Sequence, residues 1–370
     1  MWPPARIGLL TVFHKYDKIY LLRLFGCDIL ILEAYSCSDR GMQRKNNEDN
    51  LYFNGLIKDE SSDSFRHYEK MNINKRRAVF GVFDGMGGYL NGEHASYLTA
   101  DCVKSFLKDN KKGDPNELLK EIAFYAEEQV CEEVGQSGQK MGSTLAMLYF
   151  EKNNYSLCNI GDSPIYIIRK GELKRISTEH TEAAAYEKIY GEKPPKNKKF
   201  PLTQYVGMGE NITQLSPYYE HGSVNEGDIF LICSDGLTDM LDDPEISRII
   251  NSSRPLADIG KILLKNSNDK GGDDNITFIL IRATDVSESK DENDDNAVKN
   301  TESPAARSKE PMSRFDSTTA KKSDVRTKPK DEASHSEKEY EYRSIVKIVI
   351  GTVIFSVIVI AVSFITALRV

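Results

Sequence analysis

Short runs of β-branched, aromatic and aliphatic residues recur through the middle of the chain, with turn-forming residues between them. Such runs predict β-strands. They lie at 78–83, 144–150, 155–160, 164–169, 228–234 and 276–282. Lys170 and Gly171 separate the run PIYIIR from the segment ELKRI. A two-residue spacer that contains glycine is typical of a tight hairpin turn, so these two segments are expected to pair.

Two other segments have the spacing of amphipathic helices. The first places five residues on one helical face: Ala95, Leu98, Cys102, Val103 and Phe106. The second opens with Asp114, Pro115 and Glu117, which fit an N-cap, a first-turn proline and a capping-box acid. Hairpin-like strands with helices grouped between them predict an α+β fold, in which helices pack on the outside of antiparallel sheets.

The C-terminal end of the chain has a different character. From Ile348 to Leu368 there is no charged residue, and about 20 apolar residues are enough to cross a hydrocarbon core about 30 Å thick. We therefore expect a transmembrane helix over 345–368. Arg343 and Lys347 precede the run, which favours a cytoplasmic position for the bulk of the protein.

A polar segment at 284–344 precedes this run and contains few aromatic residues. It cannot bury enough apolar surface to offset its chain entropy, so a disordered tether is expected. Its basic part, at 307–330, could contact anionic lipid or simply be solvated. Residues 1–26 lack the pattern of a signal peptide and have no assigned role. One folded domain is left, at 27–283.

The composition of the chain excludes some classes of function. There are 49 Lys and Arg residues against 56 Asp and Glu, a net charge of −7, which argues against a nucleic-acid binder that works by bulk positive charge. The six cysteines are scattered and form no C-x-x-C pair. This usage is typical of a reducing compartment rather than of a disulfide framework or a zinc site.

Acidic residues recur beside glycine or other small residues, mostly next to the predicted strands. They occur in the segments Asp39–Gly41, Asn47–Asp49, Asp84–Gly88, Gly161–Ser163, Ser234–Asp239 and Asp273–Asn275. A single Asp-Gly after a strand is ordinarily a turn. Several of them in one domain would bring carboxylates to one rim of the sheets. Crowded carboxylates repel each other, and all-oxygen sites suit Mg²⁺ or Mn²⁺.

The same residues form six ordered motifs that resemble the metal-dependent protein phosphatases of type 2C, in their bacterial form with D-G-M-G-G. The motifs are D-x-G-x-x-R-x-x-N-E-D (39–49), F-D-G-M-G-G with G-E-x-A-S (83–96), G-S-T (142–144), N-I-G-D-S (159–163), S-D-G-L-x-D (234–239) and D-N-I-T (274–277). The resemblance implies two central antiparallel sheets between layers of helices. It covers about 27–283 and not the ends of the chain.

The resemblance also implies residue roles. Two metal ions would be held by Glu48, Asp84, the Gly85 carbonyl, Asp235 and Asp274. A third, weaker ion would be held by Asp162 and Asp239. A water between the ions would attack phosphorus, with Asp49 orienting or deprotonating that water. Arg44 would bind the phosphate through its planar guanidinium.

One family position differs in this chain. Relatives with D-G-H-G-G have a histidine proposed as general acid, and here that residue is Met86. Water at the third metal would then protonate the leaving alcohol, or the step would go unassisted. His180 precedes a segment, 181–206, that resembles the mobile flap of the family. Nothing near His180 in sequence makes it a base, which favours a structural role.

The pattern as a whole predicts a membrane-anchored phosphatase that acts on phosphoserine and phosphothreonine in proteins. Its expected partners are phosphorylated proteins and a Ser/Thr kinase, without nucleic acid, and we expect a monomer with its catalytic domain in the cytoplasm. The alternative is a non-catalytic scaffold of the same fold that binds phosphoproteins at the membrane. The alternative is disfavoured because the acids expected at the two-metal site are all present, namely Glu48, Asp49, Asp84, Asp235 and Asp274. No G-x-x-x-x-G-K-[ST] loop or C-x5-R signature supports a nucleotide or cysteine-phosphatase site.

Overall fold

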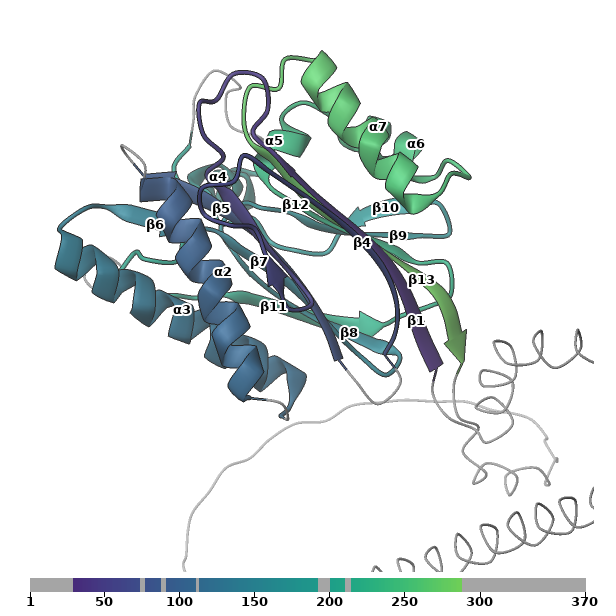
Figure 1. Cartoon of the computed structure of the whole chain (residues 1–370), viewed down its shortest axis with the longest axis horizontal. Helices are drawn as coiled ribbons and strands as arrows, with labels where there is room; N and C mark the ends of the chain where they lie inside the picture. The colour runs from purple at the N-terminus through teal and green to yellow at the C-terminus, as the bar shows by residue number, and fades with distance from the viewer. Residues whose placement is uncertain are drawn as a thin grey trace, which may run out of the picture. The chain divides into compact units, whose positions relative to one another are not determined.

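Two antiparallel β-sheets lie face to face in the computed structural model (Figure 1), which describes residues 29–73, 77–87, 91–110, 113–191, 200–209 and 214–287. One sheet has the strand order β10 (Glu172–Arg175), β9 (Ile165–Arg169), β12 (Ile229–Cys233), β13 (Ile276–Ser287), β1 (Ile29–Asp39) and β4 (Ser64–Asn72). The other has the order β11 (Tyr218–Ser223), β8 (Asn154–Ile160), β7 (Leu145–Glu151), β5 (Arg77–Gly87), β2 (Asp49–Phe53) and β3 (Leu56–Ile57), and β6 (Met141–Ser143) also pairs with β5.

Alternation along each strand builds the central core between the sheets. In β13, Ile279 and Ile281 belong to the cluster between the sheets, whereas Phe278 and Leu280 belong to the cluster on the outer face. Successive side chains of a strand point to opposite faces, so one strand serves both layers. A row of aromatic rings crosses the centre, with ring centroids 5.1 Å apart between Phe150 and Phe230.

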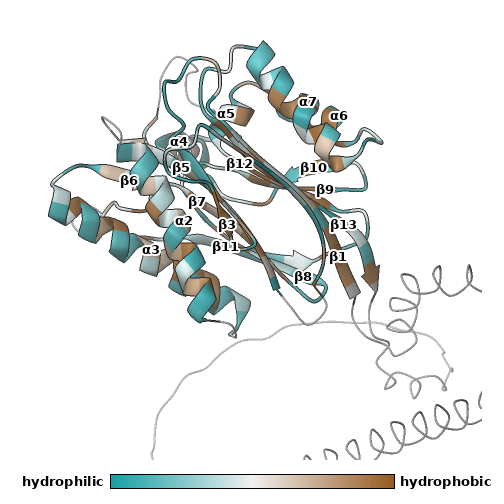
Figure 2. Ribbon diagram, in the orientation of Figure 1, coloured by the Kyte–Doolittle hydropathy of each residue, from teal (hydrophilic) through white to brown (hydrophobic). Residues whose placement is uncertain are grey.

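Helices cover both outer faces of the sandwich. The helices α2 (Asn91–Asp109) and α3 (Pro115–Ser137) pack on the sheet of β5, and α6 (Asp243–Ile250) and α7 (Leu256–Asp269) pack on the sheet of β1. Figure 2 shows apolar residues concentrated in the strands and polar residues on the outward parts of the helices. The predicted α+β fold with two antiparallel sheets is therefore confirmed.

Local sequence signals are also confirmed in detail. The Asp114 side chain caps α3 by accepting hydrogen bonds from the backbone N–H groups of Asn116 and Glu117 at 3.0 and 3.2 Å. In the β9–β10 hairpin, Lys170 and Gly171 have φ values of 53° and 84°. Positive φ at both central residues defines a type I′ turn, which matches the twist of paired strands.

Some stretches of strand lie outside the hydrophobic runs of the sequence. The strand β4 is an edge strand with mostly exposed or half-exposed residues, and its charged sequence is typical of an edge protected from further pairing. The strand β13 continues to Ser287, which pairs with Ile29 of β1. The first four residues of the predicted tether, 284–287, are therefore part of the sheet.

Among the described residues, no helix is long and apolar enough to cross a membrane. The predicted transmembrane helix at 345–368, the N-terminal extension at 1–26 and the rest of the predicted tether lie outside the residues that the structure describes.

Candidate metal and phosphate site

Five aspartates from separate motifs form an acidic cluster at one end of the sandwich. Asp49 starts β2 and is the register partner of Asp84 near the end of β5. The remaining members follow β8, follow β12 or precede β13, and are Asp162, Asp235 and Asp274. The charges of all four other members act on Asp84. Residues far apart in sequence are thus brought together by the ends of five strands.

Burial and repulsion between carboxylates raise the pKa values of Asp49, Asp84, Asp162 and Asp235. Burial is the larger cause and neighbouring carboxylates add to it, so the pKa of Asp84 lies well above its ordinary value and that of Asp235 rises to about 8. Burial is also the main cause that raises the pKa of Asp49 and that of Asp162, each to about 6. Carboxyl groups in this situation gain a proton or a cation to offset their charge.

The donor set fits divalent cations that prefer oxygen. All five side chains of the cluster are carboxylates, and Glu48, whose pKa is also raised by burial, is acted on by the charge of Asp274. Hard cations such as Mg²⁺ and Mn²⁺ take ligands of this kind. Across the described ranges, no three His, Cys, Asp or Glu side chains are grouped closely enough to hold an ion as they stand.

Arg44 provides a positive charge at the same place. Its Nη2 donates to Asp274 Oδ2 at 2.6 Å, and both side chains are partly exposed. The predicted phosphate ligand and a predicted metal ligand are therefore paired with each other. The guanidinium contacts Asp274 Oδ2, and Oδ1 accepts a hydrogen bond from the Asn275 N–H at 2.8 Å, so a metal ion at Asp274 would share or replace these partners.

Two glycines allow the backbone to approach closely around the cluster. A Cβ atom on Gly85 would lie 2.0 Å from the Gly92 carbonyl oxygen, and one on Gly236 would lie 2.0 Å from the Asn275 carbonyl oxygen. Real Cβ atoms do not come so near, so only glycine fits at both positions. The second contact holds the residue next to Asp235 against the segment that carries Asp274.

Hydrogen bonds to Asn275 and Ser234 fix the backbone and one carboxylate. The Glu48 N–H donates to Asn275 Oδ1 at 2.8 Å, and Asn275 Nδ2 donates to the Arg40 and Asn46 carbonyls at 2.9 Å each. The first motif is thus held against the last one. The Ser234 hydroxyl donates to Asp49 Oδ2 at 2.8 Å, which orients that buried carboxylate.

Lys58 is a buried cation near the cluster that no sequence motif indicates. Its side chain is 1% exposed, and its Nζ donates to the Ser62 and Asn47 carbonyls at 2.9 and 3.3 Å. Burial lowers the pKa of Lys58, while its charge helps to hold down the pKa of Asp49. A lone lysine in a loop ordinarily indicates a solvated side chain, so only the structure shows its burial.

The remaining predicted residues lie around the cluster. Asp239 is exposed, and its charge acts on Asp162 and Asp235. His180 Nδ1 accepts a hydrogen bond from the Gly161 N–H at 3.2 Å, and burial lowers its pKa. This neutral histidine supports the turn before Asp162, which agrees with the structural role expected for it.

A two-sheet sandwich with carboxylates gathered at one end is the arrangement expected of a metal-dependent hydrolase with an all-oxygen site. The chain belongs to the protein phosphatase 2C family, since the family described as Protein phosphatase 2C matches residues 61–279. The resemblance seen in the six motifs is therefore confirmed, and with it the assignment to a family of metal-dependent protein phosphatases.

Relatives in sequence and structure agree with this family. The chain is 30% identical over 259 residues to protein phosphatase PhpP of Streptococcus pneumoniae serotype 2, covering 68% of this chain and 97% of that protein. The crystal structure of the Mycobacterium tuberculosis serine/threonine phosphatase PstP/Ppp matches with a TM-score of 0.58 and 25% identity over 69% of this chain and 100% of the other. A structure of the PstP catalytic domain with two manganese ions matches with a TM-score of 0.56 and 25% identity, covering 69% and 100%.

Mn²⁺ is expected to stabilise the folded protein. Carboxylates with raised pKa values weaken the fold as they ionise, and a bound cation offsets their repulsion. At a free concentration 100-fold above Kd, binding contributes about 2.7 kcal/mol, which is roughly 5–10 °C in Tm for a domain of this size. Differential scanning calorimetry with Mn²⁺ and then with a chelator measures the shift. The Asp84→Asn variant should lose most of it, whereas Asp258→Asn, on the exposed side of α7, should keep it. An unchanged shift in Asp84→Asn contradicts the site.

Replacing Lys58 should destabilise the protein. Lys58→Met keeps the length of the side chain but leaves the buried Asn47 carbonyl and the partly buried Ser62 carbonyl without this donor, which costs about 2–3 kcal/mol. Urea unfolding measures the difference. Lys120→Met, at an exposed position of α3, is the matched control and should change the free energy of unfolding by less than about 0.5 kcal/mol. Equal effects of the two substitutions would show that the buried ammonium is not needed.

Proposed function

We propose that this chain is a metal-dependent phosphatase that removes phosphate from phosphoserine and phosphothreonine in proteins. The observation that carries the proposal is the acidic cluster, in which carboxylates from five strand ends act on one another inside a 2C-type fold. The names of relatives in Listeria welshimeri and Mycobacterium tuberculosis, both serine/threonine phosphatases, support the same activity.

In this proposal, the acidic residues act as ligands. Glu48, Asp84, the Gly85 carbonyl, Asp235 and Asp274 would hold two Mg²⁺ or Mn²⁺ ions. Asp162 and the exposed Asp239 would hold a third. Such ions supply an activated water and neutralise charge on the phosphate. Asp49 is buried and is the register partner of the partly buried Asp84, so it lies next to a residue that would be a metal ligand.

Two other residues act on the water and the phosphate. Asp49 is held by the Ser234 hydroxyl at 2.8 Å, and it would orient the attacking water or take its proton. Arg44 would leave Asp274 for the substrate, because a planar guanidinium can donate to two phosphate oxygens at once. Met86 cannot donate a proton, so the leaving alcohol takes its proton from water or departs unassisted.

The location and partners form a second part of the proposal. The uncharged run from Ile348 to Leu368 supports a single C-terminal membrane anchor with the phosphatase domain in the cytoplasm. The substrates would be phosphorylated proteins, among them a partner Ser/Thr kinase, and the enzyme would act as a monomer.

Activity should depend on both the metal and Asp274. The full chain is expected to hydrolyse p-nitrophenyl phosphate and a phosphothreonine peptide with Mn²⁺, and a chelator should abolish both reactions. Asp274→Asn should lower kcat/KM by about a hundredfold or more, since it removes one charged ligand. Asp273→Asn, at the exposed neighbouring position, should stay close to the original value. Turnover that persists without metal, or an active Asp274→Asn protein, would refute the proposal.

Deletion of residues 345–370 should release the protein from the membrane. Because the uncharged run is the proposed anchor, the shortened chain is expected in the soluble fraction after ultracentrifugation, with its phosphatase activity retained. Deletion of 1–26 serves as the comparison and should leave the protein with the membranes. A shortened chain that still sediments with membranes would disprove the anchor.

A further inference from the structure

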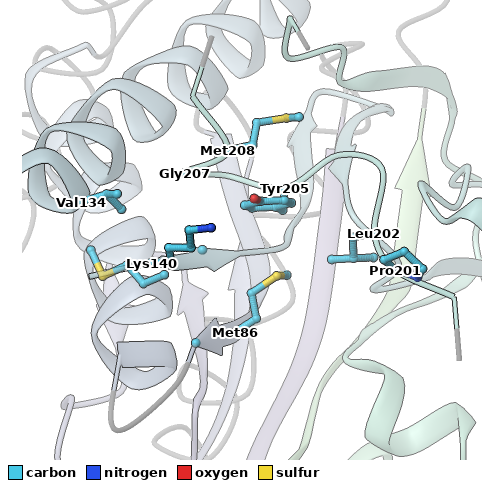
Figure 3. A pocket seen from close by; sticks show the side chains of 11 residues that line it. Met86, Val134, Lys140, Pro201, Leu202, Tyr205, Gly207 and Met208 are labelled. Carbon is cyan, nitrogen blue, oxygen red and sulfur yellow. The ribbon is translucent and has the colours of Figure 1, made fainter. Parts of the chain in front are cut away.

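An apolar groove of about 570 Å³ lies beside the acidic cluster. We call it the Met86 groove, after the residue that follows Asp84 and Gly85 on β5. Figure 3 shows Met86, Lys140 and Tyr205 around the middle of the space, with Val134 of α3 on one side and Leu202 on the opposite side. Among the described residues that line it, Lys140 is the one with a charge.

Backbone pairing and one contact of an aromatic ring fix the position of the walls of the groove. Met86 and Gly142 are register partners between β5 and β6, and the Tyr205 ring lies where a side chain on Gly142 would be. Backbone hydrogen bonds join Ser143 and Val206 in both directions, at 3.0 and 2.8 Å. These contacts place the segment 200–208 above β6.

The helix α3 fixes the other end of that segment. The Glu127 carboxylate accepts hydrogen bonds from the N–H groups of Gly207 and Gly209 at 2.5 and 2.9 Å. The wall made by 200–208 is therefore tied both to the sheet and to the helix. A site built on fixed backbone can bind a ligand without the free-energy cost of a large rearrangement.

Continuity with the acidic cluster indicates what occupies the groove. Met86 is a lining residue of the groove and lies two positions from Asp84 on the same strand. A phosphoresidue bound at the cluster has neighbours in its own chain, and these have to leave across the adjoining surface. The single cation of the lining, Lys140, matches the negative charge of a phosphopeptide, and the apolar walls match an uncharged side chain.

We propose that the Met86 groove binds a bulky aliphatic side chain of the protein substrate, within a few residues of the phosphoserine or phosphothreonine. The proposal rests on the phosphatase function above and adds a substrate class to it. The volume is ample, since an apolar cavity of about 150 Å³ already holds benzene. Because all substrates have the phosphate in common, the enzyme distinguishes between them by burying that side chain.

Matched peptides test the proposal on the full chain with Mn²⁺. Phosphothreonine peptides are made in pairs that differ only by leucine or serine at one of three positions on either side of the phosphoresidue. At the best position, kcat/KM for the leucine peptide should exceed that for the serine peptide by about tenfold or more, because burial of a leucine favours binding to this extent. Ratios near one at every position overturn the proposal.

Two substitutions on opposite walls locate the effect. Val134→Glu and Leu202→Glu should each bring the leucine-to-serine ratio to within about twofold of one, because they place a charge against the aliphatic side chain. Gln136→Glu adds the same charge at an exposed position two residues away on α3, and it should keep the original ratio. A preference that survives both wall substitutions overturns the proposal.

Other results separate this proposal from the proposed function. Hydrolysis of p-nitrophenyl phosphate, which has no side chain to place in the groove, reports on the phosphatase function alone. If that activity is absent, fluorescence anisotropy with the same peptides decides the groove: tenfold tighter binding of the leucine peptide supports it, and equal binding overturns it. A leucine preference that emerges only after deletion of 288–370 means that this part of the chain fills the groove, and it also overturns the proposal.

Discussion

Repulsion between buried carboxylates is the constraint on which the structure around the site depends. Asp49, Asp84 and Asp235 lie at the ends of strands whose other residues form the core, so the fold cannot move them apart without breaking the sandwich. Burial and the neighbouring carboxylates raise their pKa values, so the charged forms of these groups are unfavourable in this arrangement. Divalent cations relieve it, which ties the stability of this end of the domain to its chemistry.

Neutral and cationic side chains hold the region around these carboxylates in place. Asn275 joins the first and last acidic motifs through its amide, and Ser234 fixes the carboxylate of Asp49. Lys58 brings a buried positive charge from outside every motif, and Arg44 pairs with Asp274 at the rim. The acidic residues therefore form the site, while these four residues hold its backbone and side chains in position.

Much of the fold and the identity of the acidic residues could be predicted from the sequence, because both depend on local pattern. Hydrophobic runs indicate buried strands such as β5 and β7, and the Asp114 cap and the Lys170-Gly171 turn depend only on neighbouring residues. The edge strand β4 has no such signal, since its residues are mostly solvated. Burial of Lys58 and the pairing of Arg44 with Asp274 depend on contacts between distant segments, which a single sequence does not encode locally. The full length of β13 is hidden for the same reason, because residues 284–287 form a strand only by pairing with β1.

The antiparallel pair β1 and β13 determines where the two ends of the described domain lie. Ile29 pairs with Ser287 at one end, and Asp39 pairs with Ile276 at the other, near the motifs that carry Asp49 and Asp274. Strands of this length span about 35 Å at about 3.3 Å per residue. The chain thus enters and leaves the domain at its base, a full strand length from the reactive rim. The two ends of the described domain thus lie together, and neither lies at the end of the sandwich that carries the acidic cluster.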